Sequence, residues 1–153
     1  MHMVSLRTAS ELTGLSKRTL WRRIAAGRLF KLNRDEPLAR TSVALESIIA
    51  DIGIPPSDED LALIQRADGG DPEAQADVAL LLMEAGLAGK AVYWLRSAAD
   101  QGYADAMHWL GRCYVSGEGV DRDEAEGLAW IGRAAAAGHS IAGAQMQRLS
   151  QRR

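Results

Sequence analysis

The sequence predicts a mainly all-α protein in two parts: a short, basic pair of helices and a short α-solenoid of about two and a half helix-turn-helix repeats. Apolar and small residues recur at helical spacing through most of the chain, with Gly at most of the expected helix ends. A stretch rich in Gly and Pro at residues 53–57 interrupts this pattern, and the sequence beyond it repeats itself. We therefore divide the chain into residues 1–52, a linker at 53–57, and residues 58–153.

The composition is that of an ordinary globular protein, with 47% apolar and 25% charged residues among 153. The one cysteine, Cys113, cannot form a disulfide within the chain or a cysteine-based zinc site, and it fits a reducing compartment. The longest apolar runs, such as residues 78–83, are too short to cross a bilayer, and no signal-peptide pattern follows the N-terminus. We expect a cytoplasmic protein.

Charge is distributed unevenly between the two parts. Residues 1–50 carry nine Lys/Arg and four Asp/Glu, a net charge of +5, whereas residues 51–153 carry nine and sixteen, a net charge of −7. A basic head joined to an acidic remainder favours polyanion binding by the head and a different role for the rest. The alternative is that the unevenness is accidental.

The N-terminal part begins with two short helices joined by a sharp turn. We expect Thr8 to cap the first helix and Gly14 to make the turn. Ser16 can cap the second helix, in which Leu20 and Ile24 form a buried pair at i and i+4. This is the helix-turn-helix plan.

The second helix carries cations without compensating acids. In a DNA major groove, Arg side chains can bond phosphate oxygens or the O6/N7 edge of guanine. The alternative is a solvated charged surface with no ligand. The outward cations expected on this helix are Lys17, Arg18, Arg22 and Arg23.

Four short motifs extend this reading: Ala9-Ser-Glu-Leu, Gly14-Leu-Ser, Arg18-Thr-Leu-Trp-Arg and Gly27-Arg-Leu. They resemble the MerR-like and excisionase-like winged helix-turn-helix families. The resemblance implies a small wing over residues 30–41 with its turn at 33–36, followed by a helix that Ser42 caps and that runs through Ile49. It implies duplex DNA as a partner, and the expected DNA contacts are Lys17, Arg18, Thr19, Arg22, Arg23, Arg34 and Arg40.

The wing departs from the family pattern, because Asp35 and Glu36 stand where cations that contact the DNA backbone are usual. Trp21 falls at a position that is often aromatic in these families. It either packs under the wing or touches a backbone sugar, and we favour packing.

The C-terminal part repeats in two registers. The change of register falls within one loop, residues 83–90 in one copy and 115–124 in the next, and loop length costs little free energy. The predicted helices span residues 58–68, 73–84, 89–100, 104–115, 123–136 and 140–150. Matches at a spacing of 32 include Leu63/Leu95, Ala67/Ala99 and Ala74/Ala106, and matches at 36 include Trp94/Trp130, Ala98/Ala134 and Gly102/Gly138.

The later copy carries the pattern Leu110-Gly111, Tyr114, Gly117-x-Gly119-Val120, Asp123, Ala125, Trp130, Ala134-Ala135 and Gly138. It resembles the Sel-one-like repeat, a tetratricopeptide-like helical solenoid, over roughly residues 58–150. The earlier copy lacks the Gly-x-Gly-Val loop and has Leu82 in place of Tyr. The resemblance implies an adaptor whose first helices line a groove for a protein or peptide, and the expected lining residues are Gln75, His108 and Arg112.

The sequence offers no nucleophile–base pair, so we expect no enzyme activity and no cofactor. No metal site is expected either, because the histidines have no ligand spacing and the acids after Gly117 lack the alternation of a calcium loop. The main hypothesis is a DNA-binding transcriptional regulator whose repeats bind a partner protein or form a homodimer, since one helix-turn-helix makes few base contacts. The alternative is a protein-interaction adaptor whose helix-turn-helix does not read DNA. A third, weaker reading is an excisionase-like factor that bends DNA.

Overall fold

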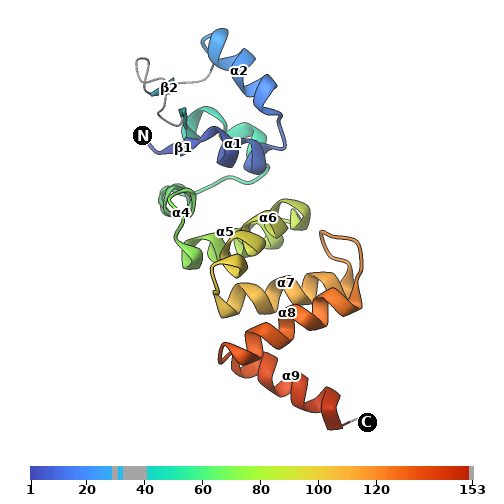
Figure 1. Ribbon diagram of the computed structural model, residues 1–153. Helices are drawn as coiled ribbons and strands as arrows, with labels where there is room; N and C mark the ends of the chain where they lie inside the picture. The colour runs from blue at the N-terminus through green and yellow to red at the C-terminus, as the bar shows by residue number, and fades with distance from the viewer. Residues whose placement is uncertain (29–30, 33–40, 152–153) are drawn as a thin grey trace. The chain divides into compact units, whose positions relative to one another are not determined.

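The computed structural model describes residues 1–28, 31–32 and 41–151 (Figure 1). The chain forms two compact units, Met1–Gly70 (unit 1) and Asp71–Arg153 (unit 2). The prediction of a mainly all-α fold that ends in a short solenoid is confirmed. None of the helices in the described residues is long and apolar enough to cross a membrane.

Unit 1 begins with the predicted helix pair, α1 (Leu6–Thr13) and α2 (Lys17–Ala25). Gly14 makes the turn between them with φ +74°, a conformation that only glycine adopts readily, and the Ser16 hydroxyl caps α2 by accepting from the Thr19 N–H at 3.1 Å.

The first cap was predicted three residues too late. Ser5 caps α1 by accepting from the backbone N–H of Thr8, which itself lies inside the helix. Leu20 is fully buried as expected, whereas Ile24 is half-buried.

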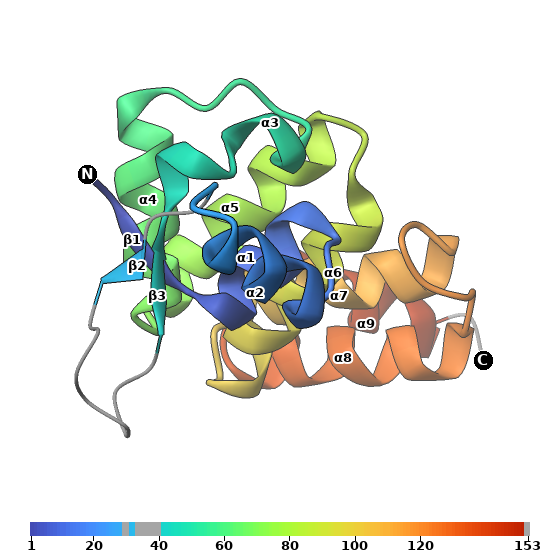
Figure 2. The ribbon, with the colours of Figure 1, turned by 90° about the horizontal axis from the view of Figure 1, so that it is seen from above.

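A three-stranded antiparallel sheet accompanies the helix pair, in the order β1 (Met3–Ser5), β3 (Ser42–Ala44), β2 (Lys31–Leu32). Figure 2 shows the sheet beside α1 and α4 within unit 1. The β2–β3 pair frames the segment predicted to be a wing, and the predicted turn at residues 33–36 lies outside the described residues.

The expected helix from Ser42 to Ile49 is a second correction. Ser42 begins the central strand, where Val43 pairs with Val4 on one side and with Lys31 on the other. Backbone pairing on both sides satisfies the N–H and C=O groups that a helix would otherwise use. A 3₁₀ turn at Leu45–Ser47 and the short α3 (Ile49–Ile52) follow the strand.

Helix α4 (Asp58–Asp68) completes unit 1. Ser57 and Asp60 form a capping box at its start, so the predicted cap is confirmed. At its other end, the Asp68 carboxylate accepts hydrogen bonds from the Ser5 hydroxyl at 2.7 Å and the Thr8 hydroxyl at 2.5 Å. These bonds tie α4 to the N-terminal segment, and the compact units divide after Gly70. The division at residues 53–57 into separately folding domains stays a prediction.

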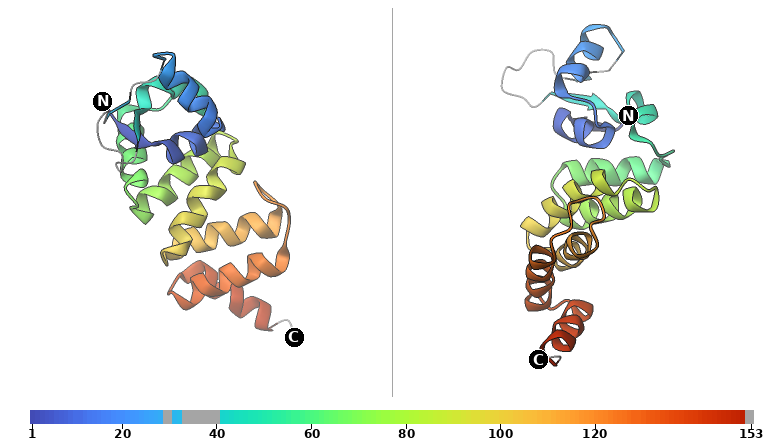
Figure 3. Two further views of the ribbon diagram at one scale, coloured as in Figure 1. Left: turned by 45° about the horizontal axis from the view of Figure 1, so that its top comes forward. Right: turned by 90° about the vertical axis from the view of Figure 1, so that its right-hand side faces the viewer.

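Unit 2 is a stack of helices in which consecutive helices run antiparallel (Figure 3). Each begins and ends within one residue of its predicted bounds: α5 (Pro72–Glu84), α6 (Ala88–Asp100), α7 (Ala104–Ser116), α8 (Glu124–Ala136) and α9 (Ser140–Gln151). Trp94 and Trp130, which match in the repeat, are 1% and 8% exposed and anchor the core.

Small residues let α7 and α8 approach closely. A Cβ added to Gly127 would lie 2.7 Å from the Gly111 carbonyl oxygen, and one added to Gly111 would lie 2.7 Å from the Gly127 carbonyl oxygen. The equivalent positions in the earlier copy are Ala79 and Ala91, both fully buried. Small residues at these positions are therefore required by helix–helix contact.

The Gly-x-Gly loop of the later copy reaches back to the earlier one. Gly117 ends α7 with φ +75°. A Cβ on Gly119 would lie 2.5 Å from the carbonyl oxygen of Ala88, at the start of α6. The loop is thus a packing element between repeats.

Candidate functional site

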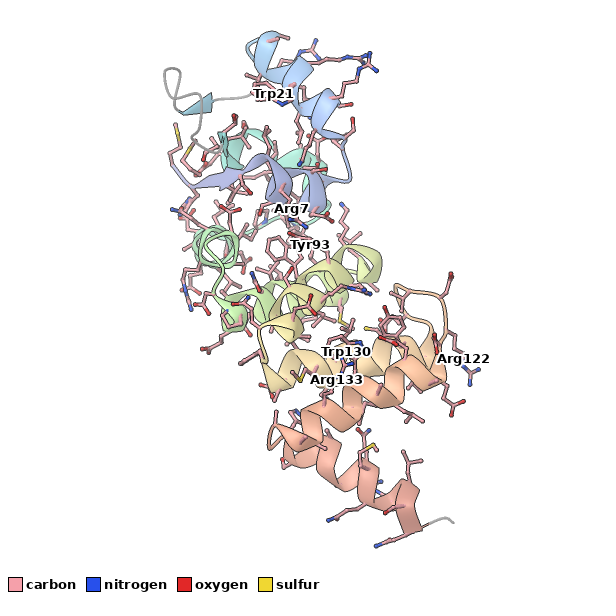
Figure 4. The ribbon with its side chains drawn as sticks, viewed as in Figure 1. Arg7, Trp21, Tyr93, Arg122, Trp130 and Arg133 are labelled. Carbon is pink, nitrogen blue, oxygen red and sulfur yellow. The ribbon has the colours of Figure 1, made fainter. Side chains whose placement is uncertain are left out.

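Helix α2 presents an exposed cationic face. Lys17, Arg18 and Arg22 are exposed, and none of them forms an ion pair with another residue that the structure describes. Thr19 is half-buried, with its hydroxyl 3.0 Å from that of Ser16. Trp21 lies on the same helix with 43% of its surface exposed (Figure 4). The face offers cations and one aromatic ring to solvent.

Arg23 differs from the other three predicted cations. Its Nη1 donates to Asp51 Oδ2 of α3 at 2.6 Å, and this hydrogen bond raises the pKa of the guanidinium. Both side chains are about 30% exposed, so the pair fastens α2 to α3 rather than leaving a cation for a ligand. Arg34 and Arg40 lie outside the described residues.

The three residues expected to line a groove in the repeats differ in how exposed they are. Gln75 is 7% exposed and accepts from Gln101 Nε2 at 2.9 Å, and His108 is 3% exposed. Both are satisfied polar groups in the helix packing. Arg112 is exposed, and it is the one of the three at an open surface.

A stacked histidine pair lies beside the junction of α7 and α9. The rings of His108 and His139 are 4.5 Å apart and nearly parallel. His139 Nδ1 accepts from the Ala142 N–H at 3.1 Å, which caps α9, and its Nε2 lies 3.2 Å from Asp105. Burial lowers the pKa of His108, and the neighbouring His139 lowers it further. In the described part of the chain, no group of three His, Cys, Asp or Glu side chains could hold a metal ion.

A hollow of about 300 Å³ opens on unit 2. Arg112 lines it with its guanidinium carbon 4.8 Å from the centroid of the Trp109 ring. Cys113 lines it with a buried side chain, and burial raises the thiol pKa to about 11, so the thiol is protonated at neutral pH. The other lining residues are Met83, Val115, Ser116, Glu118, Ile131 and Gln145.

A second hollow of about 240 Å³ adjoins the first. The two share Val115, Ile131 and Gln145, so they form one groove along α7, α8 and α9. The remaining lining residues of the second hollow are Leu128, Arg148 and Leu149.

Of the residues that line this groove, Arg112 alone was predicted from the sequence to be a groove residue, and its role in binding a partner stays a prediction. One signal for Trp109 was available, because it lies one turn before Arg112 on the same predicted helix and has no tryptophan counterpart in the earlier copy. Gln145 and Leu149 carried no such signal.

Comparison with known proteins identifies the repeats. The Sel1 repeat family model matches residues 72–103 and 104–139. The crystal structure of a Sel1 repeat protein from Oxalobacter formigenes is similar, with 33% sequence identity and a TM-score of 0.54; the match covers 64% of this chain and 30% of that one. No curated protein matches the chain. The winged helix-turn-helix resemblance of the N-terminal part stays a prediction.

Proposed function

We propose that this chain, whose residues 72–139 are two Sel1 repeats forming a protein-interaction module, is an adaptor that binds a partner protein in the groove of unit 2. The observation that carries the proposal is the groove itself: apolar side chains form its floor, and exposed Arg112 lines its open side. Interface hot spots are enriched in Trp and Arg, and Trp109 and Arg112 both line this groove. We also propose that the protein is cytoplasmic and has no catalytic activity.

Self-association is an alternative use of the same unit. Helix α9 exposes Ile141 at 57% and Leu149 at 39%, and repeat units commonly cover such surfaces by stacking. Sedimentation equilibrium of the full chain and of Ile141→Asp would detect it, since a homodimer through α9 must weaken when a charge is placed in its interface.

The adaptor proposal is tested by capture with the immobilised full chain. The wild-type chain should retain a defined protein from an extract of its own cells, identified by mass spectrometry. Arg112→Glu should lose that protein, whereas Arg122→Glu should keep it, because Arg122 is exposed on unit 2 outside the groove (Figure 4). Equal retention by both variants would rule out the groove as the binding site.

DNA binding by unit 1 is the second candidate function. It is favoured by the three exposed cations of α2, on the second helix of a pair joined by a tight turn and followed by an antiparallel β2–β3 pair. In helix-turn-helix proteins the second helix enters the major groove. A DNA-binding unit joined to a protein-interaction unit would make the chain a transcriptional regulator.

Fluorescence anisotropy with a random-sequence duplex across a salt series separates the two readings. Binding that weakens with salt supports DNA contact. The slope of the logarithm of the binding constant against the logarithm of the salt concentration should become shallower by about 1–2 in Arg18→Ala/Arg22→Ala. Arg122→Ala is the matched control. No binding at about 50–100 mM salt would leave the adaptor function alone, because phosphate neutralisation is strongest at low salt.

A further inference from the structure

Arg112 is held at the groove with its hydrogen-bonding edge available. Its guanidinium carbon lies over the Trp109 ring, 4.8 Å from the ring centroid, and a cation–π contact of this kind restricts the side chain. Arg112 has no ion-pair partner among the residues that the structure describes. A guanidinium in this state is a preorganised donor for a planar anion, and a carboxylate is the protein group that matches it.

Gln145 supplies a second polar contact where the two hollows meet. Its Oε1 lies 3.1 Å from His108 Nε2, and an N–H at that nitrogen donates to the oxygen. This bond fixes the side-chain amide and leaves its –NH₂ group for a ligand. Because Gln145 lines both hollows, its amide can donate to a backbone carbonyl of a chain laid across them.

The size and lining of the groove fit a peptide. Hollows of about 300 and 240 Å³ lie at or below the lower end of the roughly 300–1,000 Å³ typical of small-molecule pockets, so they suit single side chains. Ile131 and Val115 form an apolar floor common to both hollows. A peptide with apolar side chains at neighbouring positions would cover this floor.

The charge of the groove is opposite to that of its surroundings. Residues 71–153 carry eight Lys/Arg and eleven Asp/Glu, a net charge of −3. The ionisable side chains along the groove are instead two cations, Arg112 and Arg148, and one acid, Glu118, apart from the Cys113 thiol. A local cationic groove on an acidic unit complements individual carboxylates and disfavours a polyanion such as nucleic acid.

We propose that the groove of unit 2 binds a partner-protein segment that combines apolar side chains with a Glu or Asp, whose carboxylate is received by Arg112. The inference rests on the adaptor function proposed above and adds the chemistry of the partner. Arg112 determines specificity for the acidic residue, and the apolar floor contributes most of the buried area.

The test is selection of random 12-residue peptides displayed against the immobilised full chain, with three versions of the protein: wild type, Arg112→Gln and Arg133→Gln. Arg133 is a matched control, because it is exposed and stacks on Trp130 at 4.5 Å but does not line the groove (Figure 4). Urea unfolding checks that all three versions are equally folded. The strongest selected peptide is then synthesised with its acidic residue and with the matching amide.

We expect wild type and Arg133→Gln to enrich peptides with apolar residues next to Asp or Glu, and Arg112→Gln to lose the acidic preference. Replacing the carboxylate by the amide should weaken binding to wild type roughly tenfold and binding to Arg112→Gln hardly at all. Enriched peptides without acids, or with an acidic preference that survives in Arg112→Gln, would overturn the inference while leaving an adaptor in place. No enrichment by any version would count against both this inference and the adaptor function.

Discussion

Replacing Gly127 by alanine tests the close contact between α7 and α8. A Cβ at this position would lie 2.7 Å from the Gly111 carbonyl oxygen and 2.9 Å from the Val115 backbone nitrogen. Both atoms belong to the backbone of α7, so neither can rotate away, and the two helices must separate. Overpacking of this kind costs about 1–3 kcal/mol, and separation also loses contacts along the helix pair.

Helix propensity acts in the opposite direction, because alanine in place of glycine within a helix gains about 1 kcal/mol. We therefore expect Gly127→Ala to lower the free energy of unfolding by about 1–2 kcal/mol. Gly132→Ala on the same helix is the matched control, since its Cβ would meet only the Met146 methyl group at 3.8 Å. That variant should gain about 0.5–1 kcal/mol.

Urea unfolding followed by tryptophan fluorescence measures both variants. In a Trp21→Phe background, every remaining tryptophan lies in unit 2. The midpoint of Gly127→Ala should fall by about 0.5–1 M, and that of Gly132→Ala should rise. A Gly127→Ala protein at least as stable as its parent would show that α7 and α8 are not in contact at this crossing, and the packing argument would be wrong.

Two further substitutions probe unit 2 by the same assay. Trp130→Ala should cost about 3–5 kcal/mol because the side chain is 8% exposed, and a loss below about 1 kcal/mol would contradict its place in the core. His108 has a pKa lowered by burial, so the unfolded chain takes up its proton first as the pH falls through the ordinary value of 6.5. The contribution of His108 to the free energy of unfolding should therefore be complete above that pH and decline below it. His108→Gln should make this decline smaller. If the free energy of unfolding of the variant depends on pH as in wild type, groups other than His108 cause the decline.

Local signals accounted for most of the helical architecture. Ser16 and Ser57 were recognisable as caps because a hydroxyl before a helical pattern can satisfy the free N–H groups of the first turn. The repeat made the helices of unit 2 predictable to within a residue, since two copies of one pattern report the same bounds independently. Short strands gave no comparable signal: Met3–Ser5 spans three residues, too few to show alternation.

The candidate sites were less predictable, because they depend on residues distant in sequence. Arg23 was grouped with the other cations of its helix, and nothing local indicates that Asp51, twenty-eight residues later, would pair with it. His108 was expected at a groove, whereas its burial depends on how α9 packs against α7. The hollow beside Arg112 combines side chains from four helices, so the helix pattern alone could not outline it.

The contact between Gly119 and Ala88 gives the repeat array a direction. The loop of a later repeat rests on the second helix of the repeat before it, against the backbone carbonyl of Ala88 and beside the Val92 side chain. A duplicate of residues 104–139 inserted after residue 139 would find such a carbonyl at the start of α8. The contact between the Gly-x-Gly loop and the preceding repeat therefore permits tandem duplication in the C-terminal direction.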